Sequence, residues 1–113
     1  MFNAVIKLVT LFFIFWLPQG HATTVIHSAR VWPAQDYTRL TLESKHAIRH
    51  NMFKLNKPER LVIDLEQVEF GSALNNLPKL IGNDDPYIKS VRVGRFKRGV
   101  VRLVLDLKSA AKP

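Results

Sequence analysis

Two histidines, His46 and His50, stand four residues apart in the chain of 113 residues. On a helix this spacing brings two imidazoles to one face, where they can bind zinc. The intervening residues lack the glutamate that metalloproteases carry there, and the segment is patterned like strand and turn. The chain has no cysteine, so disulfide bonds, a cysteine-ligated zinc site and a thiol nucleophile are excluded. We therefore expect solvated histidines, no metal site and no cofactor.

Two aspartates, Asp64 and Asp106, occupy matching places in two similar segments, residues 60–65 (RLVIDL) and 102–107 (RLVLDL). A pair of carboxylates can perform general acid–base catalysis. Alternatively, each aspartate lies on a polar sheet face and pairs with an arginine of a neighbouring strand, Arg60 or Arg102. We favour the ion pairs, because neither a nucleophile elbow nor a glycine-rich phosphate loop accompanies the carboxylates. The sequence thus predicts no catalytic residues and no enzymatic activity for this chain.

A basic cluster is the strongest indication of a binding function. Residues 89–98 contain five cations and no acid, and one more arginine follows across a turn. The cluster consists of Lys89, Arg92, Arg95, Lys97, Arg98 and Arg102. The net charge of +8 also favours an anionic partner, such as nucleic acid, phospholipid or an acidic polymer. Such charges can also merely keep a small β-protein soluble and protect its sheet edges. We favour binding.

Residues 87–107 are predicted to form the β-hairpin that carries this cluster, with a turn at residues 97–99. Val91 and Val93 alternate with polar neighbours, and apolar residues recur at every second position from residue 101 to 107. Alternation of this kind points successive side chains to opposite faces of a sheet. We therefore expect Leu103 to be buried and Arg92 and Arg102 to lie on the outer face. Arg95 has the wrong parity for that face, and we expect a bulge after Gly94 to turn it outward.

Four further strands are expected over residues 25–32, 36–43, 48–55 and 60–65. Phe53 and Leu55 are expected to point inward in the third of them. Leucines spaced three and four apart predict one or two helical turns around residues 73–81, which Pro78 limits. A looser copy of the repeated segment, residues 39–43, indicates a similar strand in the same domain. Short strands separated by turn residues predict an all-β fold, a small sandwich of two short sheets or a barrel.

Residues 1–22 are predicted to be a signal peptide. Lys7 precedes an apolar run of ten residues, and Gly20 and Ala22 supply the small residues of a cleavage site. The alternative is a retained anchor, but a spanning helix needs about 20 apolar residues. We expect export, cleavage after Ala22 and no stable membrane anchor afterwards. Residues 23–107 then form the β domain, and residues 108–113 begin a linker.

Four segments of the chain together resemble the AMIN domain. They are residues 55–65 (LNKPERLVIDL), 85–88 (DPYI), 91–96 (VRVGRF) and 100–107 (VVRLVLDL). This module stands at the N-terminus of periplasmic N-acetylmuramoyl-L-alanine amidases, and it also occurs in secretin-type outer-membrane proteins. The resemblance extends over nearly all of residues 25–107. It implies a β-sandwich of two small sheets, a periplasmic location and a role in targeting to the cell wall.

The resemblance implies peptidoglycan as the partner, with divisome or outer-membrane proteins as further partners. The zinc ligands of the amidase catalytic domain have no counterpart here, so only the binding role is carried over. Peptidoglycan bears carboxylates, which arginine can hold through two hydrogen bonds. The alternative is a protein-docking module like that of the secretins. Nucleic acid is not expected, because few aromatic residues accompany the cations.

Overall fold

The computed structural model describes residues 23–113, so the predicted signal peptide lies outside the described residues. The described chain folds into six strands and a short helical segment that consists of two consecutive helices. In chain order, its elements are β1 (Ile26–Pro33), β2 (Thr38–Ser44), β3 (Arg49–Leu55), β4 (Arg60–Glu66), α2 (Ser72–Asn76), the 3₁₀ helix η2 (Leu77–Leu80), β5 (Ile88–Lys97) and β6 (Val100–Leu107). Neither helical segment is long and apolar enough to cross a membrane.

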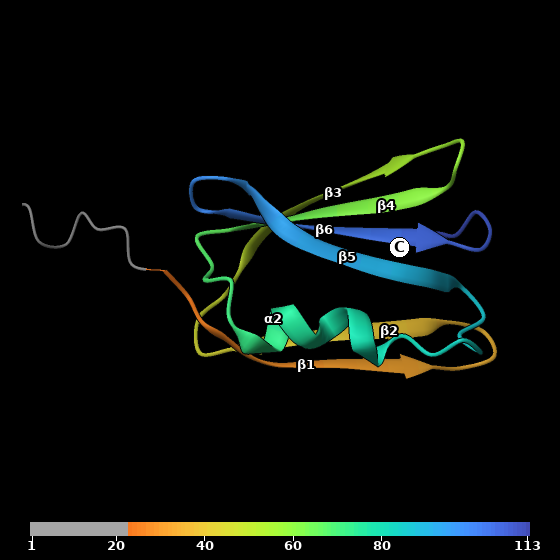
Figure 1. Ribbon diagram of the computed structural model, residues 1–113, viewed down its shortest axis with the longest axis horizontal. Helices are drawn as coiled ribbons and strands as arrows, with labels where there is room; N and C mark the ends of the chain where they lie inside the picture. Colours follow the sequence, from red (N-terminus) through yellow and green to blue (C-terminus); the bar gives the residue numbers. More distant parts are fainter. Residues whose placement is uncertain (1–22) are drawn as a thin grey trace, which may run out of the picture.

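The strands form two antiparallel sheets that pack face to face (Figure 1). One sheet contains four strands in the order β3-β4-β6-β5, and the other contains β1 and β2. The predicted all-β sandwich of two short sheets is confirmed. The predicted hairpin is β5 and β6, joined at Arg98-Gly99. Gly99 has a φ of 77°, a left-handed conformation that glycine adopts without steric cost.

The repeated segment forms β4 and β6, which lie side by side at the centre of the larger sheet. Because these strands are antiparallel, the arginine that opens each copy faces the aspartate at the fifth position of the other. Arg60 is thus the register partner of Asp106, and Asp64 is the register partner of Arg102. The motif is self-complementary in charge, and opposite charges on facing residues favour this register. The looser third copy lies in β2, in the other sheet.

The core lies between the two sheets and takes its residues from alternate positions. In β6, Val101, Leu103 and Leu105 are buried, as the alternation predicts, and Leu103 is fully inaccessible. Inward residues of β1 and β2, including Val31 and Leu42, pack against this core. Ile26 and Ala29 of β1 both face the core although they are three residues apart, because a bulge interrupts the strand between Ile26 and Ser28.

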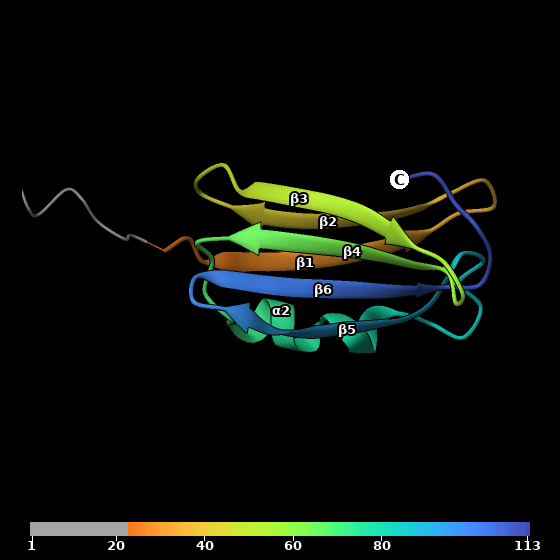
Figure 2. The ribbon, with the colours of Figure 1, turned by 90° about the horizontal axis from the view of Figure 1, so that it is seen from above.

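The predicted helical turns are present as α2 followed by η2. Leu74 and Leu77 are both fully buried and anchor this segment to the core. Pro78 stands at the start of η2, where the α-helical hydrogen-bonding pattern gives way to the 3₁₀ pattern. The segment contacts β1 and β5 and lies along β5 in Figure 2, so it closes one side of the sandwich.

The prediction that Phe53 and Leu55 point into the core is wrong. Both side chains are exposed, to 41% and 37%, and every residue of β3 is exposed. The register sets this orientation. Met52 lies opposite Ile63 on the inward face, so Phe53 lies opposite Val62 on the outward face. β3 is also an edge strand, and β2 covers it only in part, so even its inward residues stay accessible.

Asp85 fixes the start of the hairpin. Its side chain is 1% exposed, and its Oδ1 accepts hydrogen bonds from the backbone N–H groups of Tyr87 and Ile88. The hydroxyl of Thr38, at the start of β2, donates a third at 2.9 Å. Burial raises the pKa of Asp85, but these hydrogen bonds outweigh it and hold the pKa below its usual value. The carboxylate therefore ties the two sheets together where β5 begins.

Candidate binding surface

The outer sheet face is the side of the four-stranded sheet turned away from β1, β2 and the helical segment. Its residues follow from the strand register, with one outward side chain at every second position. They include the two arginines and two aspartates of the repeated segment, Arg60, Asp64, Arg102 and Asp106, together with apolar neighbours. The central ones are Phe53, Arg60, Val62, Asp64, Arg92, Arg102, Val104 and Asp106.

Arg102 stands near the centre of this face. Its Nε and one terminal nitrogen donate to the two carboxylate oxygens of Asp64 at 2.8 and 2.9 Å, a bidentate ion pair. The guanidinium carbon lies 3.5 Å from the ring centroid of Phe96 and 5.6 Å from that of Phe53. Such guanidinium–aromatic contacts are attractive and orient the side chain. Arg102 is thus held from three directions.

This environment shifts the titration of both partners. The hydrogen bond from Arg102 lowers the pKa of Asp64, although burial acts in the opposite direction. The hydrogen bond to Asp64 raises the pKa of Arg102. The positive charge of Lys97 makes a smaller contribution to the lowered pKa of Asp64. Both groups are therefore charged at neutral pH, as an ion pair rather than an acid–base catalyst.

A second ion pair joins β5 to β6. Arg92 donates to both oxygens of Asp106, at 3.1 and 2.9 Å, and the hydroxyl of Ser90 donates a further bond. Burial raises the pKa of Asp106, but the bonds from Arg92 and Ser90 lower it by more. The interpretation of the two aspartates as ion-pair partners is confirmed. Asp64 has the expected partner, whereas Asp106 binds Arg92, and Arg60 instead donates to the carbonyl of Pro58.

The aromatic and aliphatic residues of this face were not predicted from the sequence. Val62 points outward between Phe53 and Val104, yet it is only 3% exposed and lies outside the main core. A bulge between Arg95 and Lys97 places Phe96 on the same face, over Arg102. The sequence carried no clear signal for the outward orientation of Phe53, because it follows from the pairing of Met52 with Ile63.

The six predicted binding residues do not form one cluster. Arg92 and Arg102 lie on the outer sheet face, and Lys97 and Arg98 stand at the hairpin tip, defined as residues 97–99. Lys89 sits in a bulge at the other end of β5, about 26 Å from the tip at the rise of an extended strand. Arg95 keeps the inward parity of Val101, and its guanidinium lies 5.7 Å from the ring of Phe70. The bulge lies between Arg95 and Lys97 rather than directly after Gly94, so it turns Phe96 outward and leaves Arg95 inward.

The cations of the hairpin also differ in their pairing. Arg92 and Arg102 are held by carboxylates. Within residues 23–113, no carboxylate lies within 4 Å of the charged ends of Lys89, Lys97 or Arg98, and all three residues are exposed. Lys97 only approaches the ring of Phe96, at 5.9 Å. Arg95 is likewise exposed and has no carboxylate within 4 Å in this range. Three of the four unpaired cations of the hairpin therefore lie at or next to its tip, and Lys89 is the fourth.

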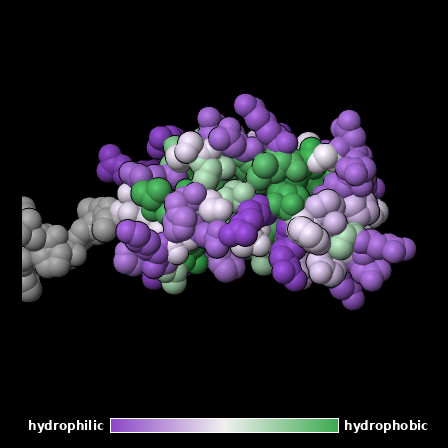
Figure 3. Space-filling view, turned by 90° about the horizontal axis from the view of Figure 1, so that it is seen from below, coloured by the Kyte–Doolittle hydropathy of each residue, from purple (hydrophilic) through white to green (hydrophobic). Residues whose placement is uncertain are grey.

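The opposite face of the molecule, formed by β1, β2 and the helical segment, is mainly polar with an apolar patch (Figure 3). Its outward side chains include Arg30, Trp32 and Arg39, and the indole of Trp32 is 66% exposed. Arg30 is neutralised by Glu43 at 2.5 Å. In the described part of the chain, no three His, Asp or Glu side chains are grouped as metal ligands. His50 lies in β3 rather than in a helix.

The sandwich and its surface agree with a comparison to known proteins. The sequence profile of the AMIN domain matches residues 28–113, so the chain belongs to the AMIN domain family. Among curated proteins it is similar to N-acetylmuramoyl-L-alanine amidase AmiC of Escherichia coli O6:H1, with 45% identity over 92 residues. It is also similar to AmiC of Neisseria meningitidis serogroup B, with 44% identity over 81 residues.

These matches involve a small part of each relative. They take in 81% of this chain but 22% of the Escherichia coli protein, and 72% of this chain but 20% of the Neisseria protein. The chain therefore spans about a fifth of the length of the curated relatives it matches. The shared region is the AMIN domain itself.

Proposed function

We propose that this chain is a non-catalytic module that binds peptidoglycan in the periplasm and targets an attached or associated amidase to it. The observation that carries the proposal is the hairpin tip, where Lys97 and Arg98 are exposed and, within residues 23–113, have no carboxylate within 4 Å. The ring of Phe96 lies beside Lys97. The two AMIN-containing relatives are named for a bond between N-acetylmuramic acid and L-alanine, which is a peptidoglycan bond.

The ligand chemistry suits this surface. Peptidoglycan is a polymer with repeated carboxylates, so a few exposed cations can bind it through many weak and simultaneous contacts. Exposed ion pairs are each worth little and are screened over roughly 8 Å at physiological salt. Binding through them should therefore depend strongly on salt. Arg92 and Arg102 contribute a fixed, hydrogen-bonded surface beside the tip rather than free charges.

The test is co-sedimentation of the purified protein with peptidoglycan sacculi and with sacculi whose carboxylates have been amidated by carbodiimide coupling. We expect sedimentation with untreated sacculi at low salt and its loss on amidation or at about 0.5 M salt, where the screening length is shorter. Equal sedimentation with both preparations would contradict binding through carboxylates. No sedimentation with either preparation would contradict the proposed function as a whole.

The proposed lack of catalysis rests on two observations. The matches take in only about a fifth of each amidase, and the sequence contains no recognisable set of amidase zinc ligands. We expect the purified chain to release no stem peptides from sacculi above a buffer control, with or without added zinc. Release of stem peptides that increases with protein concentration would show that the chain is an enzyme.

Export is the third part of the proposal. Residues 1–22 have the charge, apolar run and small residues of a cleaved leader. We expect mass spectrometry of the protein from the periplasmic fraction to show an N-terminus at Thr23. Protein that retains Met1 would contradict cleavage.

A further inference from the structure

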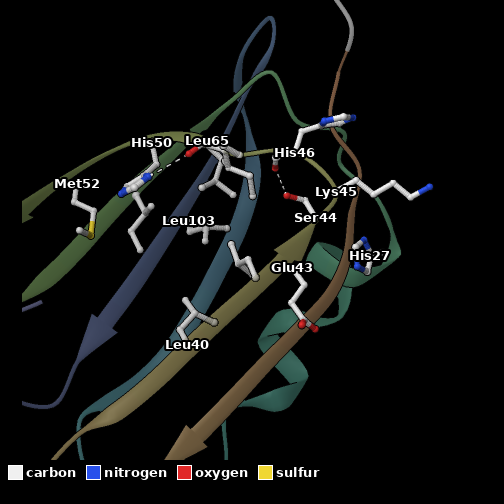
Figure 4. Close-up of a pocket in the computed structure, with 14 residues that line it drawn as sticks. His27, Leu40, Glu43, Ser44, Lys45, His46, His50, Met52, Leu65 and Leu103 are labelled. Carbon is white, nitrogen blue, oxygen red and sulfur yellow. Dashed lines mark hydrogen bonds between the residues drawn. The ribbon is translucent and has the colours of Figure 1, made fainter.

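The two sides of the sandwich are closed differently. On one side α2 and η2 lie across the space between β1 and β5. On the other side the free edges of β2 and β3 face each other, and nothing in the described residues lies between them along most of their length. A groove of about 710 Å³ opens there (Figure 4). The loop of residues 45–48, which connects β2 to β3, closes one end of it.

The floor of this groove is apolar, and its rim is polar. Leu40 and Leu42 of β2 face Ile63, Leu65 and Leu103 across the interior. Met52 projects into it from β3 with 48% of its surface exposed. In Figure 4 the side chains of Leu40 and Leu103 point into the space, with Glu43, Lys45 and His46 along the rim. The lining therefore offers apolar contact below and charged contact at the edge.

The other end of the same opening already holds a length of peptide. The C-terminal residues 110–113 line a neighbouring cavity together with Thr38 at the start of β2 and Leu105 of β6. Lys54, an inward residue of β3, donates from its Nζ to the carbonyl oxygen of Ala111 at 3.3 Å. Figure 2 shows the C-terminus lying beside β2 and β3. A chain segment thus fits between these strands, and the groove is the part of the opening that no described segment fills.

β2 offers the better edge for a further strand. A sheet of two strands is marginal by itself and gains stability from a third. β3, in contrast, carries charged and polar residues on both faces, including Arg49, His50 and Lys54, which discourage pairing at an edge. A strand added to β2 would direct every second side chain over Leu40 and Leu42, toward Met52.

The charges along β2 indicate the chemistry of the remaining side chains. Glu43 is neutralised by Arg30, whereas within residues 23–113 no carboxylate lies within 4 Å of the charged ends of Arg39 or Lys45. The outward side of an added strand would therefore meet net positive charge. We propose that the groove binds an extended peptide segment of a partner protein, in which apolar residues alternate with acidic ones, as a third strand on β2. This inference does not depend on peptidoglycan binding.

The probe is a capped peptide of about seven residues, matching the seven residues of β2, in which valine alternates with glutamate. In NMR spectra of the purified ¹⁵N-labelled protein, we expect the chemical shifts of the β2 backbone amides to change saturably with peptide concentration. We also expect hydrogen exchange at these amides to become slower. Replacing the central valine with proline should abolish binding, because proline cannot donate to the ladder. Replacing the glutamates with lysine should weaken binding by about tenfold or more.

A pair of variants separates the groove from the outer sheet face. Met52 and Phe96 are 48% and 49% exposed, so Met52→Glu and Phe96→Glu place equal charge at equally accessible sites. Met52→Glu should weaken binding of the probe peptide by about tenfold or more, and Phe96→Glu should weaken it by about twofold or less. Met52→Glu should leave sedimentation with sacculi unchanged. Circular dichroism checks that both variants are folded.

Several results would overturn the proposal. One is the absence of any saturable shift at millimolar peptide. Others are shifts confined to β3 or to the outer sheet face, equal binding of the proline-containing peptide, and equal effects of Met52→Glu and Phe96→Glu. A protein that binds the probe peptide but does not sediment with sacculi would contradict the proposed function and leave the groove proposal standing.

Discussion

The body and the tip of the β5–β6 hairpin both carry positively charged side chains, but these side chains differ in whether a carboxylate pairs with them. In the body, Arg92 and Arg102 each donate two hydrogen bonds to a carboxylate across the strands. At the tip, Lys97 and Arg98 are exposed and have no carboxylate partner in the described chain. The same residue types thus stabilise the sheet in one place and remain free for a ligand in the other.

The difference shows why a count of cations does not define a binding site. Each body arginine is opposed by an aspartate from the repeated motif, so the body is close to neutral despite its arginines. The tip is the turn itself, and the residue opposite Lys97 is the apolar Val100, so no facing residue supplies an acid. A polyanion therefore meets net positive charge mainly at Arg95, Lys97 and Arg98.

The largest effect is expected from the buried side of the hairpin. Leu103→Ala should lower the free energy of unfolding by about 2–5 kcal/mol, because Leu103 is fully inaccessible and the change leaves a cavity. The neighbouring Val104→Ala is the control, since Val104 is half-buried on the outer sheet face. Urea unfolding measures both. Equal midpoints for the two variants would contradict the assigned faces of β6.

Loss of a body arginine should have a smaller effect, and it should differ between the two ion pairs. Arg102→Gln should destabilise more than Arg92→Gln, because the Asp64 side chain is 15% exposed and Arg102 29%, against 62% for Arg92. Removing Arg102 leaves a partly buried carboxylate without its partner. From the sequence, Arg102 was expected on the outer face as one of the cations of a binding cluster, and its aromatic contacts add a structural role.

A double-mutant cycle with Asp64→Asn measures this coupling. We expect Arg102→Gln to cost less stability when Asp64 is already neutral. A cost that is the same in both backgrounds would mean that the ion pair does not stabilise the hairpin body.

Acid should lower the stability that the carboxylates of the hairpin body contribute, and it should not change the contribution of the tip. The pKa values of Asp64, Asp85 and Asp106 are all below the usual 3.8 in the folded state. Their contribution to stability is therefore fully present above the unfolded pKa and is lost as pH falls through the lowered folded values. We expect urea midpoints to be level near neutrality and to fall below about pH 4. Asp106→Asn should make that fall shallower, and a stability that rises on acidification would contradict these shifts.

The smallest change in stability is expected at the tip. Lys97→Gln combined with Arg98→Gln should alter the free energy of unfolding by no more than about 0.5 kcal/mol, since both side chains are exposed and unpaired. Thermal unfolding by circular dichroism is sufficient to check this. A loss comparable to that of Arg102→Gln would show that the tip charges are structural as well.

The sequence predicted the elements whose pattern is set locally. The alternation in residues 100–107 gave the buried face of β6, and the leucine spacing gave the position of α2 and η2. The orientation of Phe53 was not predictable, because an edge strand that is exposed on both faces has no clear alternation. The placement of Arg95 and Phe96 depended on a bulge, whose position follows from the pairing of β5 with β6 rather than from either strand alone.

The partners of the charged residues were likewise only half predictable. The repeat placed Asp64 opposite Arg102, but Asp106 binds Arg92, on the strand at its other side. A central strand has two neighbours, and the repeat identifies only one of them.

The most direct test of the account compares two variants of equal charge in co-sedimentation with sacculi. One carries Lys97→Gln and Arg98→Gln at the tip, and the other carries Lys79→Gln and Lys112→Gln at exposed sites outside the hairpin. At low salt, we predict that the tip variant loses most of its binding while the control variant sediments like the parent. Equal binding by the two variants would contradict the claim that the hairpin tip holds the cell wall.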